Sequence, residues 1–106
     1  MEEIQDPVQF FRFIERTDVQ GCLVDFYAKW CGPCMKLAPI LEQMREEYPL
    51  IAFAKVDCDE SEMSDIVAAN KIESLPTIGF YRNGKYFSRV AGFDPDSVRS
   101  VLDTMV

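Results

Sequence analysis

Residues 22–34 read CLVDFYAKWCGPC, and they decide how the chain is organised. Positions 22–27 are almost all apolar, which is typical of a strand covered on both faces. Apolar residues at helical spacing then follow over residues 35–48. The C-x-x-C motif Cys31–Cys34 therefore lies at a strand-to-helix junction, where unpaired backbone N–H groups and the helix dipole favour the reactive thiolate form of Cys31.

Length and composition indicate one globular domain over residues 1–106. The chain is 48% apolar with eight Phe, and no stretch approaches the ~20 apolar residues of a membrane span. The net charge of −7 disfavours nucleic acid and anionic membranes, since both attract clustered Lys and Arg. The acidic balance is typical of a soluble protein, with partner docking as the alternative interpretation.

The absence of histidine limits the chemistry that the chain can perform. Cys–His and Ser–His pairs and every His-containing zinc site are excluded, so proton transfer falls to Asp, Glu, Lys, Cys, Tyr or water. Four cysteines would suit a secreted disulfide framework. However, residues 1–6 are acidic and lack the features of a signal peptide. We therefore expect a cytoplasmic chain with a redox-active C-x-x-C.

The order of the remaining patterns predicts an α/β sandwich with a mixed sheet. Asp6-Pro7 and Asp94-Pro95 each predict the start of a helix, and Asn83-Gly84 predicts a tight hairpin. Alternating strands and helices imply parallel pairing, whereas the hairpin implies an antiparallel pair. The predicted strands cover residues 3–5, 22–27, 51–56, 77–81 and 85–91, and the helices cover 7–15, 35–48, about 61–70 with a cap at Asp59 or Ser61, and the segment from Pro95 to Met105.

These motifs together resemble the thioredoxin family over essentially the whole chain. The resemblance implies the thioredoxin fold, in which a central mixed β-sheet is flanked by four helices in a three-layer sandwich. A lone C-x-x-C would be weak support, but several further segments match in the expected order. The matching residues are Val24-Asp25-Phe26, Trp30-Cys31-Gly32-Pro33-Cys34, Lys36, Ala38-Pro39, Lys55-Val56-Asp57, Leu75-Pro76-Thr77, Asn83-Gly84 and Gly92.

The family resemblance assigns the two motif cysteines different roles. Cys31 would be the exposed nucleophile, and Cys34, more buried, would resolve the mixed disulfide. Gly32 and Pro33 would tune the potential, because this pair accompanies reducing members of the family. A permanently closed disulfide and half of a zinc site are the alternatives, but Cys22 and Cys58 are not spaced as a second C-x-x-C.

The resemblance also supplies a proton acceptor in place of histidine. Asp25 would lie beneath Cys34 and take its proton, since burial should raise the pKa of Asp25 toward neutrality. Lys55 would pair with Asp25 and moderate that rise. A satisfied core acid is the alternative interpretation of Asp25, because a buried carboxylate costs several kcal/mol unless it is paired or protonated.

A substrate-binding rim around Cys31 is implied as well. Pro76 is the position of the family's cis-proline, which would place the Leu75 backbone where a substrate chain can add strand-like hydrogen bonds. Trp30, Ala91 and Gly92 would complete a shallow apolar rim. Asp59 matches the acid that bonds the Trp30 indole, although capping the following helix would explain it nearly as well.

The resemblance implies a general protein-disulfide reductase with no bound cofactor and no metal. Its electrons would come from NADPH through a flavin-dependent thioredoxin reductase, and its substrates would be disulfide-containing proteins such as peroxiredoxins. We expect a monomer. The alternatives are a redox-gated binding module that uses the Trp30 and Pro76 surface, and an isomerase domain, which Pro33 disfavours. Cys22 is interpreted as a small core hydrophobe, whereas Cys58 stays open to modification, with its pKa raised by neighbouring acids.

Overall fold

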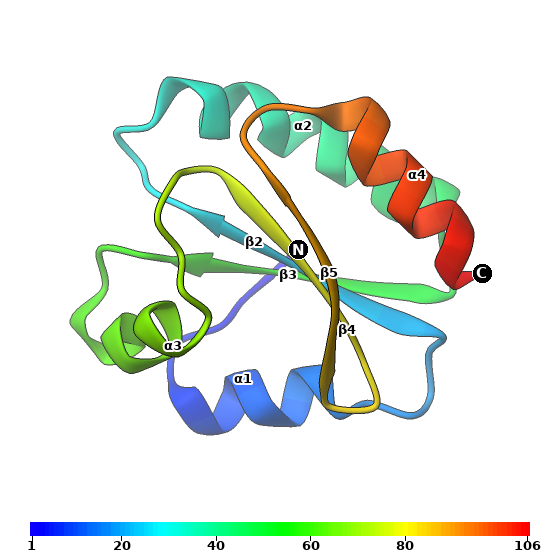
Figure 1. The fold of residues 1–106 in the computed structure, drawn as a ribbon, viewed down its shortest axis with the longest axis horizontal. Helices are drawn as coiled ribbons and strands as arrows, with labels where there is room; N and C mark the ends of the chain where they lie inside the picture. The colour runs from blue at the N-terminus through cyan, green and yellow to red at the C-terminus, as the bar shows by residue number, and fades with distance from the viewer.

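The computed structural model describes all 106 residues, and a central five-stranded sheet with helices on both faces organises them (Figure 1). This confirms the fold and the element order that the sequence predicts. One 3-10 turn, Ser61–Met63, is additional. The strands are β1 (Glu2–Glu3), β2 (Gly21–Tyr27), β3 (Ile51–Asp57), β4 (Thr77–Arg82) and β5 (Lys85–Ala91), and the helices are α1 (Pro7–Ile14), α2 (Gly32–Glu47), α3 (Ser64–Ala69) and α4 (Pro95–Met105).

The strand order is β1-β3-β2-β4-β5, so β2 lies at the centre of the sheet. β1, β3 and β2 pair in parallel, whereas β4 and β5 add as an antiparallel hairpin. α2 and α4 cover one face of the sheet, and α1 and α3 cover the other (Figure 1). This arrangement brings the end of β2, the start of α2 and the start of β4 together.

Each face of the sheet has its own core, because successive side chains of a strand point to opposite sides. Val24 and Phe26 of β2 pack with Phe10 of α1, whereas Leu23 packs with Leu37 of α2. All seven residues of β2 are buried. The alternation places Asp25 on the same side as Leu23, which is the side that α2 covers.

Local sequence signals position the starts of α1 and α4. Asp6 accepts a hydrogen bond from the backbone N–H of Gln9 at 2.8 Å, and Asp94 accepts one from that of Ser97 at 3.1 Å. The cap predicted at Asp59 or Ser61 is wrong, because neither the 3-10 turn nor α3 begins with a side-chain cap bond. That short segment is held by packing of Met63 and Ile66 instead.

The two edges of the sheet differ in character. β1 has only two residues, and β5 is largely exposed and carries Lys85 and Arg89. The hairpin between β4 and β5 turns at Asn83 and Gly84, both with positive φ (54° and 79°), as the sequence predicts.

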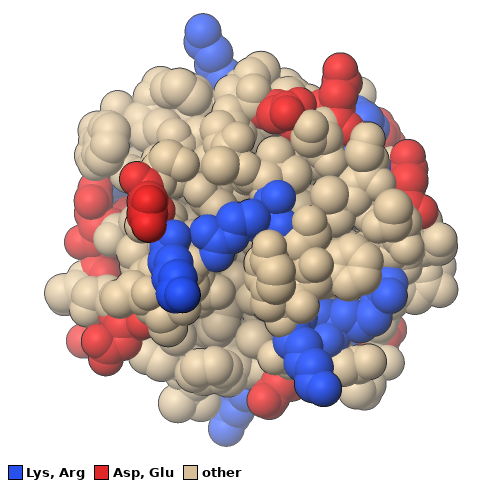
Figure 2. Space-filling model, viewed as in Figure 1, with Lys and Arg blue, Asp and Glu red and all other residues tan.

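The net charge of −7 is unevenly distributed over the surface. On the face seen in Figure 1, Lys and Arg side chains lie across the middle, and most acidic side chains lie nearer the rim (Figure 2). None of the helices combines the length and the hydropathy that a membrane crossing requires.

Candidate active site

Cys31 and Cys34 form a disulfide in the first turn of α2. Cys31 is the residue that caps the helix, and its Sγ accepts a hydrogen bond from the backbone N–H of Cys34 at 3.2 Å. The same donor would favour negative charge on Cys31 once the disulfide is reduced. Nothing lies within contact distance above Gly32, so the backbone beside the two sulfurs is open to an incoming chain.

Both sulfurs are enclosed in the disulfide form. Cys31 is 4% exposed and Cys34 is 1% exposed, so the expectation of an exposed Cys31 is wrong for this state. Tyr27, Ala28 and Leu75 pack around the pair and cover it. Cys31 remains the more accessible of the two cysteines in this state.

Asp25 is a buried acid on the α2 side of the sheet. Its side chain comes from the middle of β2 and is 2% exposed, and its Oδ1 has no hydrogen-bond partner. Burial raises the pKa of Asp25 from its ordinary value to about 7, the positive charge of Lys55 lowers it, and the negative charge of Glu3 raises it. A carboxyl group that titrates near pH 7 can both accept and release a proton at neutral pH.

Lys55 is the strand neighbour of Asp25 but does not form an ion pair with it. The β2–β3 register places Lys55 directly opposite Asp25. The Lys55 Nζ nevertheless lies 4.0 Å from Oε1 of Glu3, and no oxygen of Asp25 lies within that distance. The direct pair expected from the sequence is therefore wrong, although Lys55 does lower the pKa of Asp25 as expected. The reason is that β1 brings a second carboxylate to the other side of Lys55.

The chain before β4 forms the predicted rim next to the disulfide. The Leu75–Pro76 peptide bond is cis, and Leu75 packs against the buried cluster that contains the two cysteines. Gly92 donates its backbone N–H to the Pro76 carbonyl at 2.7 Å and has a φ of +84°, which favours glycine at this position. Ala91 pairs with Thr77, so it lies beside the same loop.

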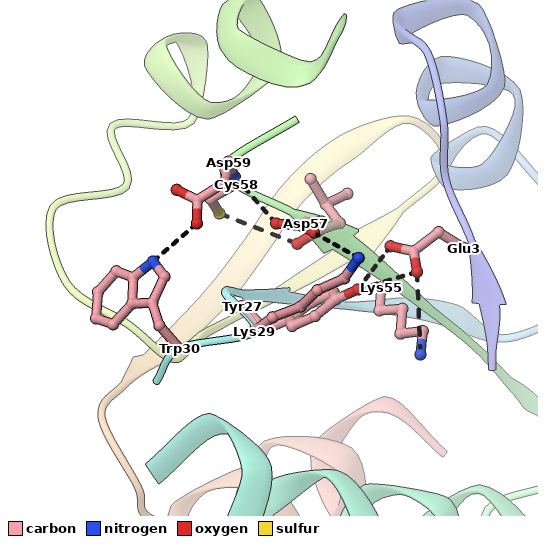
Figure 3. A network of polar contacts seen from close by, with 9 residues as sticks. Glu3, Tyr27, Lys29, Trp30, Lys55, Asp57, Cys58 and Asp59 are labelled. Carbon is pink, nitrogen blue, oxygen red and sulfur yellow. Dashed lines mark hydrogen bonds and ion pairs between the residues drawn. The ribbon is translucent and has the colours of Figure 1, made fainter. Parts of the chain in front are cut away.

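Trp30 forms the exposed side of the rim. It is 73% exposed, and its indole N–H donates to the Asp59 carboxylate at 2.7 Å. The Asp57 carboxylate in turn accepts a hydrogen bond from the backbone N–H of Asp59 at 3.0 Å, and this bond helps to hold Asp59 in place (Figure 3). Asp59 therefore orients the Trp30 ring, and capping of the following helix is not its function.

Tyr27 and Glu3 are the site neighbours that sequence reasoning missed. The Tyr27 hydroxyl donates to both carboxylate oxygens of Glu3, at 2.9 and 3.0 Å (Figure 3). Tyr27 is two residues after Asp25, so the strand period alone places both side chains on one face. The partnership with Glu3 depends on the β1–β3 register, which no local signal in the sequence reveals.

The remaining cysteines are free and lie outside the disulfide cluster. Burial raises the pKa of Cys22 to about 11, and its Sγ donates to the Phe13 carbonyl at 3.2 Å. Burial and then the charges of Asp57, Asp25 and Asp59 raise the pKa of Cys58 to about 12, as expected from its acidic neighbours. Neither thiol is activated as a nucleophile. No cluster of three or more His, Cys, Asp or Glu side chains is suited to a metal ion.

The chain is similar to known proteins in both sequence and structure. The family model described as thioredoxin matches residues 3–104. Thioredoxin-1 of Saccharomyces cerevisiae is 39% identical over 80 residues, which is 76% of each chain. The X-ray structure of Fasciola hepatica thioredoxin superposes with a TM-score of 0.92 at 29% identity, covering 100% of both chains. A structure that concerns the thiol resolving mechanism of yeast mitochondrial 1-Cys peroxiredoxin superposes at 0.90, with 27% identity and coverage of 98% and 94%.

Proposed function

The chain belongs to the thioredoxin family, and on that basis we propose that it acts as a general protein-disulfide reductase in the cytoplasm. It is a thiol–disulfide oxidoreductase, and its working group is the pair Cys31 and Cys34. The observation that carries the proposal is the position of Cys31 as the helix cap, with its Sγ 3.2 Å from the Cys34 backbone N–H. This position favours a thiolate on Cys31 in the reduced protein.

The reaction is a two-step exchange that transfers two electrons to the substrate. The Cys31 thiolate attacks a substrate disulfide, forms a mixed disulfide and releases one substrate thiolate. Cys34 then loses its proton and attacks the sulfur of Cys31. The second substrate sulfur leaves as a thiolate that takes up a proton, and the Cys31–Cys34 disulfide is formed.

Asp25 takes the proton of Cys34 in this scheme. Support comes from its pKa of about 7, its burial and its place on the side of the sheet that α2 covers. Lys55 tunes Asp25 through its positive charge. Gly32 and Pro33 keep the potential low, as the family resemblance implies.

The substrate chain lies across the rim formed by Trp30, Pro76 and Gly92, with Leu75 and Ala91 beside it. The support is local: Trp30 is exposed, and the space above Gly92 and Gly32 is open. Backbone contacts on a shallow rim suit substrates of many sequences, since main-chain hydrogen bonds do not depend on side chains.

The cycle is closed by partners that the family implies. A thioredoxin reductase returns electrons from NADPH, and the protein itself carries no bound cofactor. Peroxiredoxins are proposed as substrates because one of the similar structures concerns a peroxiredoxin that is resolved by the glutathione/thioredoxin systems. The free thiols of Cys22 and Cys58 suit a reducing compartment such as the cytoplasm. The protein acts as a monomer.

Reduction of insulin disulfides by dithiothreitol tests the activity. The parent protein should accelerate the reaction, Cys34→Ser should abolish turnover, and Cys58→Ser should match the parent as a cysteine-loss control. Incubated with target proteins in their disulfide form, reduced Cys34→Ser should also accumulate stable mixed disulfides on Cys31, visible by mass spectrometry. An inactive parent, or trapping on Cys58, would contradict the proposal.

A further inference from the structure

Three charged side chains form a row across three neighbouring strands, from the central strand β2 to the edge strand β1. The β1–β3 register pairs Glu3 with Lys55, and the β2–β3 register pairs Lys55 with Asp25. Paired residues of adjacent strands project to the same face. Lys55 is therefore placed between two carboxylates, one buried in the central strand β2 and one in the edge strand β1.

The ammonium group of Lys55 is held toward the outer carboxylate. Its Nζ is 4.0 Å from Oε1 of Glu3 and 5.5 Å from the centre of the Tyr27 ring (Figure 3). Tyr27 fixes Glu3 in turn, because its hydroxyl donates to both carboxylate oxygens. Oδ1 of Asp25 has no hydrogen-bond partner at all.

We propose that Glu3 is a positioning residue that, together with Tyr27, withholds the Lys55 ammonium from Asp25 and so sets the pH at which Asp25 accepts a proton. The inference rests on the proposed role of Asp25 in the reductase. An ammonium group that turned inward to Asp25 would stabilise its carboxylate and make it a weaker base. Glu3 opposes that in two ways, because it retains the cation and adds its own negative charge.

The charges around Asp25 come from every element packed against it. Ile78 of β4, which does not titrate, lies opposite Asp25 in the strand register. The cysteines at the start of α2 form a disulfide and do not titrate in the oxidised protein. The pKa of Asp25 is lowered by Lys55 and raised by Glu3, after the larger effect of burial. The charge of Asp25 acts on Tyr27 of β2 and on Cys58 after β3, and Asp57 of β3 acts on the same two groups. Lys29 lies 3.9 Å from Asp57.

Substitution of Glu3 by Gln tests the inference with a small change of structure. Gln retains an oxygen that accepts the Tyr27 hydroxyl but has no charge to hold Lys55. We expect the midpoint of Asp25 titration, followed by carboxyl ¹³C NMR of the oxidised protein, to fall by about half a unit or more, because the two carboxylates are only two strand spacings apart.

Glu2→Gln is the matched control. Glu2 is the neighbouring residue of β1, carries the same charge and points away, where it accepts from the Gln9 side chain. It should leave the Asp25 midpoint within about a tenth of a unit of the parent value, since its charge lies on the other side of the strand. Equal shifts of the Asp25 midpoint in Glu3→Gln and Glu2→Gln would mean that the shift reflects only the change in net charge, and this result would overturn the proposal.

A second variant and a rate profile separate this inference from the reductase proposal. Tyr27→Phe releases Glu3 without a change of charge and should also lower the Asp25 midpoint. The pH profile of insulin reduction should move in the same direction in Glu3→Gln, and this movement should vanish when Asp25 is also changed to Asn. An unchanged Asp25 midpoint in an active Glu3→Gln protein would overturn the inference alone, whereas an inactive parent would overturn the proposed function.

Discussion

Asp25 is an acid placed inside a strand whose seven residues are all buried. Because burial favours the neutral form, the folded protein holds a proton on Asp25 at pH values where the unfolded chain has lost it. Stability and proton acceptance are therefore linked at one residue. The burial that would make Asp25 a base at neutral pH also destabilises the folded protein once Asp25 is ionised.

The sign of this linkage gives a prediction for Asp25→Asn. The pKa of Asp25 is raised from 3.8 to about 7 in the folded state, so its contribution to stability is present below pH 3.8 and is lost as the pH rises toward 7. The gap between these two values corresponds to roughly 4 kcal/mol at most. Relative to the parent, oxidised Asp25→Asn should gain stability as the pH rises and level off above about pH 7.

Urea unfolding of the oxidised proteins at several pH values measures the difference. Asp65→Asn, which removes a charge from an exposed position on α3, serves as the control and should follow the parent. A difference between Asp25→Asn and the parent that does not change with pH would contradict the linkage.

The sequence reveals part of this residue-scale picture and hides the rest. An acid between Val24 and Phe26 is conspicuous in an apolar run, so its burial and raised pKa can be predicted from local sequence. The actual partner of Lys55 cannot. Glu3 comes from a two-residue strand, and only the register of β1 on β3 decides which carboxylate the ammonium meets.

At the scale of elements, β4 depends on a residue that lacks a side chain. A Cβ on Gly79 would lie 2.7 Å from the Tyr81 hydroxyl oxygen, because the Tyr81 ring folds back over the glycine. The ring is only 3% exposed, and its hydroxyl donates to Oδ1 of Asn70 at 2.7 Å. Arg89 of β5 also donates to the carbonyls of Asn70 and Lys71, which ties the end of α3 to the hairpin.

Gly79→Ala should therefore destabilise the protein. A Cβ at position 79 requires the buried Tyr81 ring to shift, which strains its hydrogen bond to Asn70. We therefore expect a loss of about 1–3 kcal/mol in the free energy of unfolding. Denaturant unfolding measures it, and Gly79→Ala combined with Tyr81→Leu should recover part of the loss. Unchanged stability in the single variant would contradict the packing role of Gly79.

Helix starts can be predicted from the sequence where a local signal sets them, and cannot be where distant contacts do. The starts of α1 and α4 were predictable because Asp-Pro supplies both the cap and the first helical residue. The start of α3 was not, since it has no side-chain cap and Asp59 bonds Trp30 instead. A glycine within a strand, such as Gly79, indicates close packing, but the amino-acid sequence does not show that Tyr81 is the neighbour.

For the whole molecule, the pair of residues between the two cysteines predicts a reducing protein. Gly32 and Pro33 separate the cysteines, as in the reducing members of the family, so the expected midpoint potential is near −270 mV. Equilibration with glutathione or dithiothreitol buffers, followed by quantification of the disulfide, measures it. A midpoint above roughly −200 mV would contradict the reductase direction.

The two edges of the sheet affect how readily other chains can add to the sheet and aggregate with it. Unpaired strand edges invite other chains to add and to aggregate. Here β1 offers only two residues, and β5 is exposed but carries Lys85 and Arg89. Both edges therefore disfavour non-specific strand addition by other chains. Short and charged edges would keep a disulfide reductase from becoming a template for aggregation of its substrates. Under the proposed function, the short backbone stretch at Pro76 is then the place where an extended substrate strand would pair.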